Sequence, residues 1–172
     1  VTGRELVWDV VDADANSRVR HVFFGATGAV TDKMIERLRA RNAGVRVQAY
    51  NPPFGAMSDD ELDRVCNGLA SDGPAIVWVG LSTPKQEQMT VRLSQRFPNS
   101  PVVAIGAGFD FVAGLKPVAP AIMTSLSLEW LFRLASEPRR LFRRYAEIVP
   151  RFLLLVAREL ARGTLLSRSG AA

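Results

Sequence analysis

The chain has 172 residues, of which 48% are hydrophobic and 23% charged, as expected for one soluble globular domain with a sizeable core. Its single cysteine excludes a disulfide framework or a cysteine metal site and favours a reducing compartment, and no run of about 18 apolar residues predicts a membrane-spanning helix. The net charge of +5 lies entirely after residue 128, where nine arginines face four glutamates. An anionic partner is therefore expected for the last quarter of the chain.

Helices and short apolar strands alternate through the first two thirds of the chain. Thr2 and Glu5 have the spacing of a capping box and predict a first helix over residues 2–15. Three further helices are expected, the second opened by a capping box at Ser58 and Glu61. The strands are predicted at 21–24, 45–50, 75–79 and 102–105, and the further helices at 30–41, 59–70 and 84–97. This alternation predicts an α/β fold with a doubly wound, mainly parallel sheet.

Three of the predicted strands end in glycine-bearing turns. These turns are Gly25–Gly28, Gly80–Thr83 and Gly106–Gly108, and in a parallel sheet they share one edge. Glycines let a ligand approach the backbone, and helix N-termini attract anions, so a diphosphate is the expected ligand. The first turn matches neither a Walker A loop nor a dinucleotide fingerprint, which disfavours a dinucleotide cofactor. Plain loops are the alternative for each turn taken alone.

The third predicted strand leads directly into a polar helix start. Ser82 or Thr83 can cap this helix, and Pro84 suits its first turn, which also holds Lys85, Gln86 and Glu87. Open α/β sheets bind ligands at such strand ends. An ordinary connection with solvated polar residues is the alternative.

Asp110 stands between two phenylalanines just past the last predicted strand. It could bind sugar hydroxyls, act as a base, or only cap the loop. The acidic pair Asp59 and Asp60 is explained by helix capping, and no Asp-x-Asp follows a strand, so no metal and no cofactor are expected. His21 is interpreted as a satisfied strand residue, and Cys66 as a small core residue.

The C-terminal segment is predicted to be helical and amphipathic, divided or kinked at Pro138 and Pro150. Arginines recur along one stripe, and an apolar stripe runs beside it. The arginines are Arg133, Arg140, Arg144, Arg151, Arg158 and Arg162. This pattern favours binding to an anionic membrane surface. The alternatives are a helix packed on the domain with solvated arginines, and a nucleic-acid arm, which the leucine-rich stripe disfavours. The expected organisation is a core over 1–120, an appendage over 121–166 and a disordered tail over 167–172.

Several motifs in the same order resemble the WecG/TagA/CpsF family of bacterial glycosyltransferases. They are Gly25, Pro84-Lys85-Gln86-Glu87, the stretch from Gly106 to Gly114, Leu128–Leu134, Glu137–Leu141 and Arg144-Tyr145. The resemblance covers residues 1 to about 160. It implies a Rossmann-like core with a helical C-terminal appendage.

The resemblance also implies an activity: inverting, metal-independent transfer of a hexosamine-type sugar from a UDP-linked donor such as UDP-N-acetylmannosamine. The acceptor would be linked to a polyprenyl diphosphate, at the inner face of the cytoplasmic membrane, in synthesis of surface polysaccharide or teichoic acid. Gln86 would contact a sugar, and Arg133, Arg140 and Arg144 would meet a diphosphate. No counterpart of the family's proposed catalytic Asp is found here, so the catalytic residue is unknown. A non-catalytic donor-binding or membrane-scaffold module is the alternative, and self-association is left open.

Overall fold

The computed structural model describes most of the chain, in two compact units, Val1–Pro117 and Val118–Ala172. The described residues are 2–14, 16–53, 55–70, 73–126 and 128–161. The tail predicted for 167–172 lies outside them.

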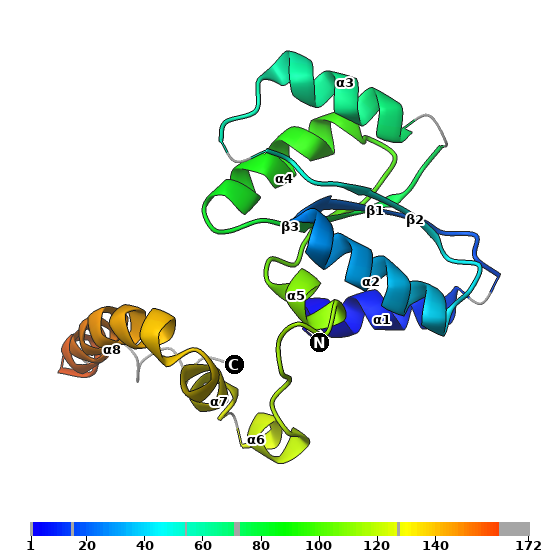
Figure 1. Ribbon diagram of the computed structural model, residues 1–172. Coiled ribbons are helices and arrows are strands. Elements are labelled where there is room, and N and C mark those ends of the chain that lie inside the picture. The colour runs from blue at the N-terminus through cyan, green and yellow to red at the C-terminus, as the bar shows by residue number, and fades with distance from the viewer. Residues whose placement is uncertain (1, 15, 54, 71–72, 127, 162–172) are drawn as a thin grey trace, which may run out of the picture. The chain divides into compact units, whose positions relative to one another are not determined.

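The first unit is built on a four-stranded sheet in which every strand pair is parallel (Figure 1). The strands are β1 (Arg20–Gly25), β2 (Arg46–Tyr50), β3 (Ile76–Gly80) and β4 (Val102–Ala104), in the spatial order β2-β1-β3-β4. All four predicted strands are confirmed. The last one is not buried as expected: Val102 and Val103 are half-buried and Ala104 is exposed, because β4 forms an edge of this sheet.

Helices cover both faces of the sheet (Figure 1), which confirms the doubly wound α/β prediction. On one face lie α1 (Gly3–Ala13), α2 (Gly28–Arg41) and α5 (Gly108–Val112), and on the other lie α3 (Asp59–Ala70) and α4 (Lys85–Arg96). The short helix α5 falls where the sequence predicted only a turn and a loop. Phe109 and Val112 are buried in it, so apolar burial stabilises a turn of helix too short to show a periodic pattern.

Each face has its own apolar core. Under α1, α2 and α5, the rings of Phe23 and Trp78 stack on neighbouring strands, and Phe109 meets Phe23 edge to face at 5.4 Å between centroids. Under α3 and α4 the core includes Phe24, Val77, Leu93 and Cys66. Burial raises the pKa of the Cys66 thiol to about 11, as expected for a core residue rather than a nucleophile.

Local hydrogen bonds explain where several helices begin. The Thr2 hydroxyl accepts from the Glu5 amide, and the Glu5 carboxylate accepts from the Thr2 amide, so the predicted capping box is present. The Ser58 hydroxyl likewise accepts from the Glu61 amide at 3.2 Å. Helix α4 differs from prediction, because Pro84 occupies the N-cap position and neither Ser82 nor Thr83 caps an amide.

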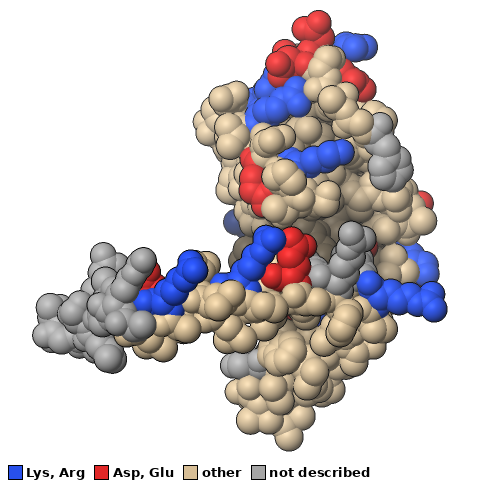
Figure 2. Space-filling model, turned by 90° about the vertical axis from the view of Figure 1, so that its left-hand side faces the viewer, with Lys and Arg blue, Asp and Glu red and all other residues tan. Residues whose placement is uncertain are grey.

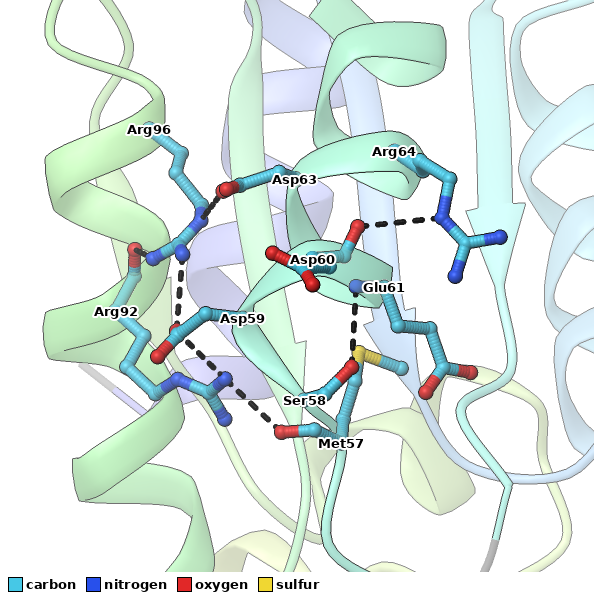
Figure 3. Close-up of polar contacts among 9 residues, drawn as sticks. All are labelled: Met57, Ser58, Asp59, Asp60, Glu61, Asp63, Arg64, Arg92 and Arg96. Carbon is cyan, nitrogen blue, oxygen red and sulfur yellow. Dashed lines mark hydrogen bonds and ion pairs between the residues drawn. The ribbon is translucent and has the colours of Figure 1, made fainter.

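A network of ion pairs joins α3 to α4 (Figure 3). The Asp59 carboxylate accepts from Arg92 and Arg96 at 2.9 Å each, and Asp63 accepts from Arg96 at 2.5 Å. Arg92 also donates to the Met57 carbonyl at 2.9 Å, which ties the loop before α3 to α4. These arginines hold the pKa of the Asp59 carboxyl below its ordinary value. Helix capping therefore explains the Asp59–Asp60 pair only in part, because the Asp59 carboxylate forms ion pairs with Arg92 and Arg96.

Two buried polar side chains lie at the start of β1 and point to opposite faces of the sheet. Arg20 donates to the Gln48 side chain, to the Leu69 carbonyl at the end of α3, and to the Gly73 carbonyl. The His21 Nδ1 atom accepts from the Trp78 indole N–H at 3.0 Å, while its Nε2 has no partner among the described residues. Among the described residues, His21 therefore has a hydrogen-bond partner at one of its two ring nitrogens.

The second unit consists of helices. They are α6 (Ala121–Ser125), α7 (Glu129–Ser136) and α8 (Pro138–Ala161). The predicted division at Pro138 is confirmed, but α8 continues through Pro150. Uncharged surface predominates where α6 and α7 lie, whereas acidic and basic side chains gather over α3 in the first unit (Figure 2). Within the described part of the chain, no helix is both long and apolar enough to cross a bilayer.

Candidate functional site

The three glycine turns lie side by side at the carboxyl ends of β1, β3 and β4, as predicted. Gly25 and Gly80 are paired in register across β1 and β3. The Gly106 amide donates to the Val79 carbonyl at 3.2 Å, which places the third turn beside the second. Residues 25, 80 and 106, separated by 81 positions in sequence, thus form one continuous edge.

The structure gives a packing reason for two of these glycines. A Cβ on Gly25 would lie 2.5 Å from the Gly80 carbonyl oxygen, and Gly25 has a φ of +133°. A Cβ on Gly80 would lie 2.6 Å from the ring of Phe109. Both positions therefore exclude a side chain because the protein itself approaches closely, whereas the sequence reading had ascribed them to a ligand. At Gly28 a Cβ would meet no atom within 4 Å, so this side of the turn is open.

The turn between β1 and α2 is held in a conformation that L-residues rarely adopt. Ala26 has a φ of +58°, and its amide donates to the Gly80 carbonyl at 3.2 Å. Thr27, the N-cap of α2, makes no side-chain bond to the helix amides. Thr27 and Gly28 are exposed. The edge therefore presents an uncapped helix N-terminus, which is electrostatically suited to an anion.

Asn51, which follows β2, also belongs to this edge, although it is not among the residues singled out from the sequence. Its side-chain amide donates to the Gly25 carbonyl at 3.0 Å and to the Thr31 hydroxyl at 3.2 Å. The one feature of the sequence that could have pointed to Asn51 is its position directly after a strand and before two prolines.

The Pro-Lys-Gln-Glu segment begins α4 at the same edge. Lys85 and Glu87 are exposed, and the Thr83 hydroxyl donates to the Glu87 carboxylate at 3.2 Å. The Gln86 amide lies against Gly106, where a Cβ would be 3.3 Å from its Oε1 atom. That oxygen is buried and has no hydrogen-bond partner among the described residues. A buried acceptor without a hydrogen-bond partner costs free energy. The Gln86 side chain is therefore a place where a ligand could complete the hydrogen bonding.

Asp110 lies in α5 and is half-buried. Its carboxylate forms an ion pair with Lys116 at 3.1 Å, and its backbone carbonyl accepts from the amides of Leu115 and Lys116. The pair joins α5 to the chain that leaves the first unit. The sugar-binding, base and loop-capping roles considered from sequence stay predictions.

The arginines predicted to meet a diphosphate belong to the second unit. Arg133 donates to the Glu129 carboxylate at 2.6 Å, one turn earlier in α7. Arg140 and Arg144 lie within α8, but their side chains are outside the described residues. Their roles stay predictions.

In the described ranges, no cluster of three or more His, Cys, Asp or Glu residues is placed to hold a metal ion. The candidate site thus consists of backbone turns, amides and a few side chains from several strand ends. Such a site can bind and orient a ligand through N–H donors and a helix dipole.

A parallel sheet covered by helices on both faces, with glycine turns converging at its carboxyl edge, defines a Rossmann-like α/β protein. The comparison with protein-family models identifies the family. The model of the "Glycosyl transferase WecG/TagA/CpsF family" matches residues 1–165, and the chain belongs to that family. The resemblance noted in the sequence is thereby confirmed.

Two curated relatives carry the same name, N-acetylglucosaminyldiphosphoundecaprenol N-acetyl-beta-D-mannosaminyltransferase. The protein of Bacillus spizizenii is 29% identical over 156 residues, which cover 91% of this chain and 58% of the relative. The protein of Bacillus subtilis is 28% identical over 146 residues, covering 84% of this chain and 55% of the relative. The chain thus spans a little more than half the length of these relatives.

Proposed function

We propose that this chain forms the donor-binding part of a glycosyltransferase that moves a hexosamine-type sugar from a UDP-linked donor to a polyprenyl-diphosphate-linked acceptor. The convergence of the family's motifs at one edge of the sheet carries this proposal. Gly25, Gln86 and Gly106 come from three separate segments near the carboxyl ends of β1, β3 and β4, and the uncapped N-terminus of α2 follows the first of them. The names of the two Bacillus relatives supply the sugar and the acceptor class.

In the proposed reaction an acceptor hydroxyl attacks the anomeric carbon, its proton passes to a base, and UDP leaves from the opposite face with inversion. The positive end of the α2 dipole would stabilise the charge that develops on the leaving diphosphate, without a metal. In the second unit, Arg133, Arg140 and Arg144 are proposed to bind a diphosphate, that of the lipid-linked acceptor or of the leaving group. The base stays unassigned, and a non-catalytic donor-binding or membrane-scaffold module is the alternative.

Calorimetric titration with UDP and with UDP-N-acetylhexosamines tests donor binding. The chain is expected to bind both. Gln86→Leu is expected to lower the affinity for the sugar nucleotide about tenfold, because the substitution removes an amide from the site. Gln88→Leu is the matched control, since Gln88 is exposed on the same helix. Absence of binding by the unaltered chain would contradict the proposal. Sugar transfer by this chain alone would exclude the non-catalytic alternative.

For the second unit we propose attachment to an anionic membrane surface, at the cytoplasmic side. Large apolar side chains of α8 are exposed, among them Phe152 at 61%, Leu153 at 59% and Leu154 at 61%. Arginines lie on the same helix, and the net positive charge of the chain is confined to this region. An apolar face flanked by cations suits the headgroup boundary of anionic lipids.

Sedimentation with vesicles of anionic and of neutral lipid tests this attachment. Replacing Phe152, Leu153 and Leu154 by Ser is expected to abolish binding to anionic vesicles. Val91→Ser is the control, because Val91 is an apolar side chain of the first unit with similar exposure, 59%. Undiminished vesicle binding by the triple variant would refute the role of α8.

A further inference from the structure

Asn51 connects the end of β2 to the turn after β1 and to the first turn of α2. It follows β2, yet its side-chain amide reaches 26 residues back to donate to the Gly25 carbonyl at 3.0 Å. A longer contact, 3.4 Å, joins the same nitrogen to the Ala26 carbonyl. The two carbonyls flank the left-handed residue of the turn, so Asn51 bonds the turn where its backbone is least favourable.

The contacts of Asn51 continue into the first turn of α2. Its amide donates to the Thr31 hydroxyl at 3.2 Å, and that hydroxyl donates in turn to the Gly28 carbonyl at 3.0 Å. Thr31 is 1% exposed, so its hydroxyl is fixed by burial. The chain of bonds runs from the end of β2 across the turn to the start of α2.

The opposite side of the turn is held by β3. The Ala26 amide donates to the Gly80 carbonyl, and a Cβ on Gly25 would lie 2.5 Å from the Gly80 carbonyl oxygen. The turn is therefore clamped between β3 on one side and Asn51 on the other. Its Thr27 and Gly28 positions stay exposed.

We propose that Asn51 is a positioning residue for the donor's diphosphate, acting through the Gly25–Gly28 turn and the first amides of α2. This inference rests on the proposed function, because it assigns the diphosphate to that turn. Asn51 holds the amide donors in the direction that the phosphate oxygens require. The turn is therefore ordered before the ligand arrives, and the entropic cost of binding is small. Because, among the described residues, Asn51 hydrogen-bonds only to this turn and Thr31, uridine binding is expected not to depend on it.

Calorimetry with two probes, UDP and uridine, separates positioning from a general structural role. Asn51→Ala is expected to lower the affinity for UDP about tenfold and to leave the affinity for uridine unchanged. Thr31→Val, which removes only the hydroxyl, is expected to weaken UDP several-fold. Thr31→Ser restores the hydroxyl and is expected to restore UDP affinity.

Asn42→Ala is the matched control. Asn42 caps the other end of α2, and its amide also donates to a backbone carbonyl, that of Asp14, at 3.0 Å. It is expected to leave the affinity for UDP unchanged. Amide hydrogen exchange in the peptide 25–31 is measured alongside and is expected to accelerate in Asn51→Ala but not in Asn42→Ala.

Unchanged UDP affinity in Asn51→Ala would overturn the inference, and so would an equal loss for UDP and uridine. Unchanged exchange in peptide 25–31 would refute the clamp itself. A failure of the unaltered chain to bind UDP would instead overturn the proposed function, and with it the assignment of this turn to a diphosphate. The exchange result would then still report whether Asn51 holds the turn.

Discussion

The two units of the chain use apolar residues in opposite ways. In the first unit, Phe23, Trp78 and Phe109 are all nearly or fully buried against one another. Among the described residues of the second unit, Leu141 is the one large apolar side chain that is buried, and most of the others are exposed. The first unit buries most of its large apolar side chains within itself, whereas the second leaves most of its own exposed.

The largest test of this contrast replaces one phenylalanine in each unit. Phe23→Ala should lower the free energy of unfolding by about 3–5 kcal/mol, because it removes a ring from a closely packed core. Phe152→Ala should change it by no more than about 0.5 kcal/mol, since that ring is exposed. Urea denaturation measures both. Equal losses would show that α8 packs internally in solution.

A second comparison concerns arginine. Arg20→Leu should cost about 2 kcal/mol, because the carbonyls of Leu69 and Gly73 and the Gln48 side chain lose a buried donor. Arg151→Leu, in α8, should leave urea stability nearly unchanged, since its pair with Glu147 is exposed. A small effect of Arg20→Leu would mean that water replaces the guanidinium.

A third test uses pH. Burial lowers the pKa of His21 below its ordinary value, so the unfolded chain takes up a proton that the folded chain resists. Stability should therefore fall as the pH drops below about 6.5. His21 is the single histidine of the chain, so His21→Phe should flatten this dependence between pH 7 and 5.5. Denaturation midpoints at the two pH values check it, and an unchanged slope in the variant would contradict it.

The smallest expected effect lies in the α3–α4 network. Asp59→Asn should cause a slight loss of stability that shrinks in high salt, because Asp59 is exposed and its pairs with Arg92 and Arg96 are screened. A double-mutant cycle of Asp59 and Arg92, at two salt concentrations, measures the coupling. A coupling that is independent of salt would indicate that hydrogen bonding, not charge, joins the helices.

The sequence predicted the features that local chemistry determines. The capping box of Thr2 and Glu5, the four strands and the alternation that makes the sheet parallel all depend on short-range patterns. The common edge of the three glycine turns followed from parallel topology. These expectations could be reached from spacing and residue type alone.

What the sequence could not predict depends on contacts between distant segments. The reach of Asn51 to Gly25 and the enclosure of Arg20 by the end of α3 have no local pattern. The edge position of β4 depends on strand order, which alternation does not specify. Gly80 was singled out from the sequence for a ligand, whereas its packing reason, the ring of Phe109, is visible only in three dimensions.

The thiol of Cys66 makes the chain its own conformational reporter. With a pKa of about 11 and a buried position under α3 and α4, it stays protonated near neutral pH and reacts slowly with alkylating reagents while the fold is closed. The rate of modification therefore measures how often that layer opens. Cys66 is the single cysteine of the chain. Because it is buried, a second cysteine introduced at an exposed residue of α8 would react with a label much faster than Cys66.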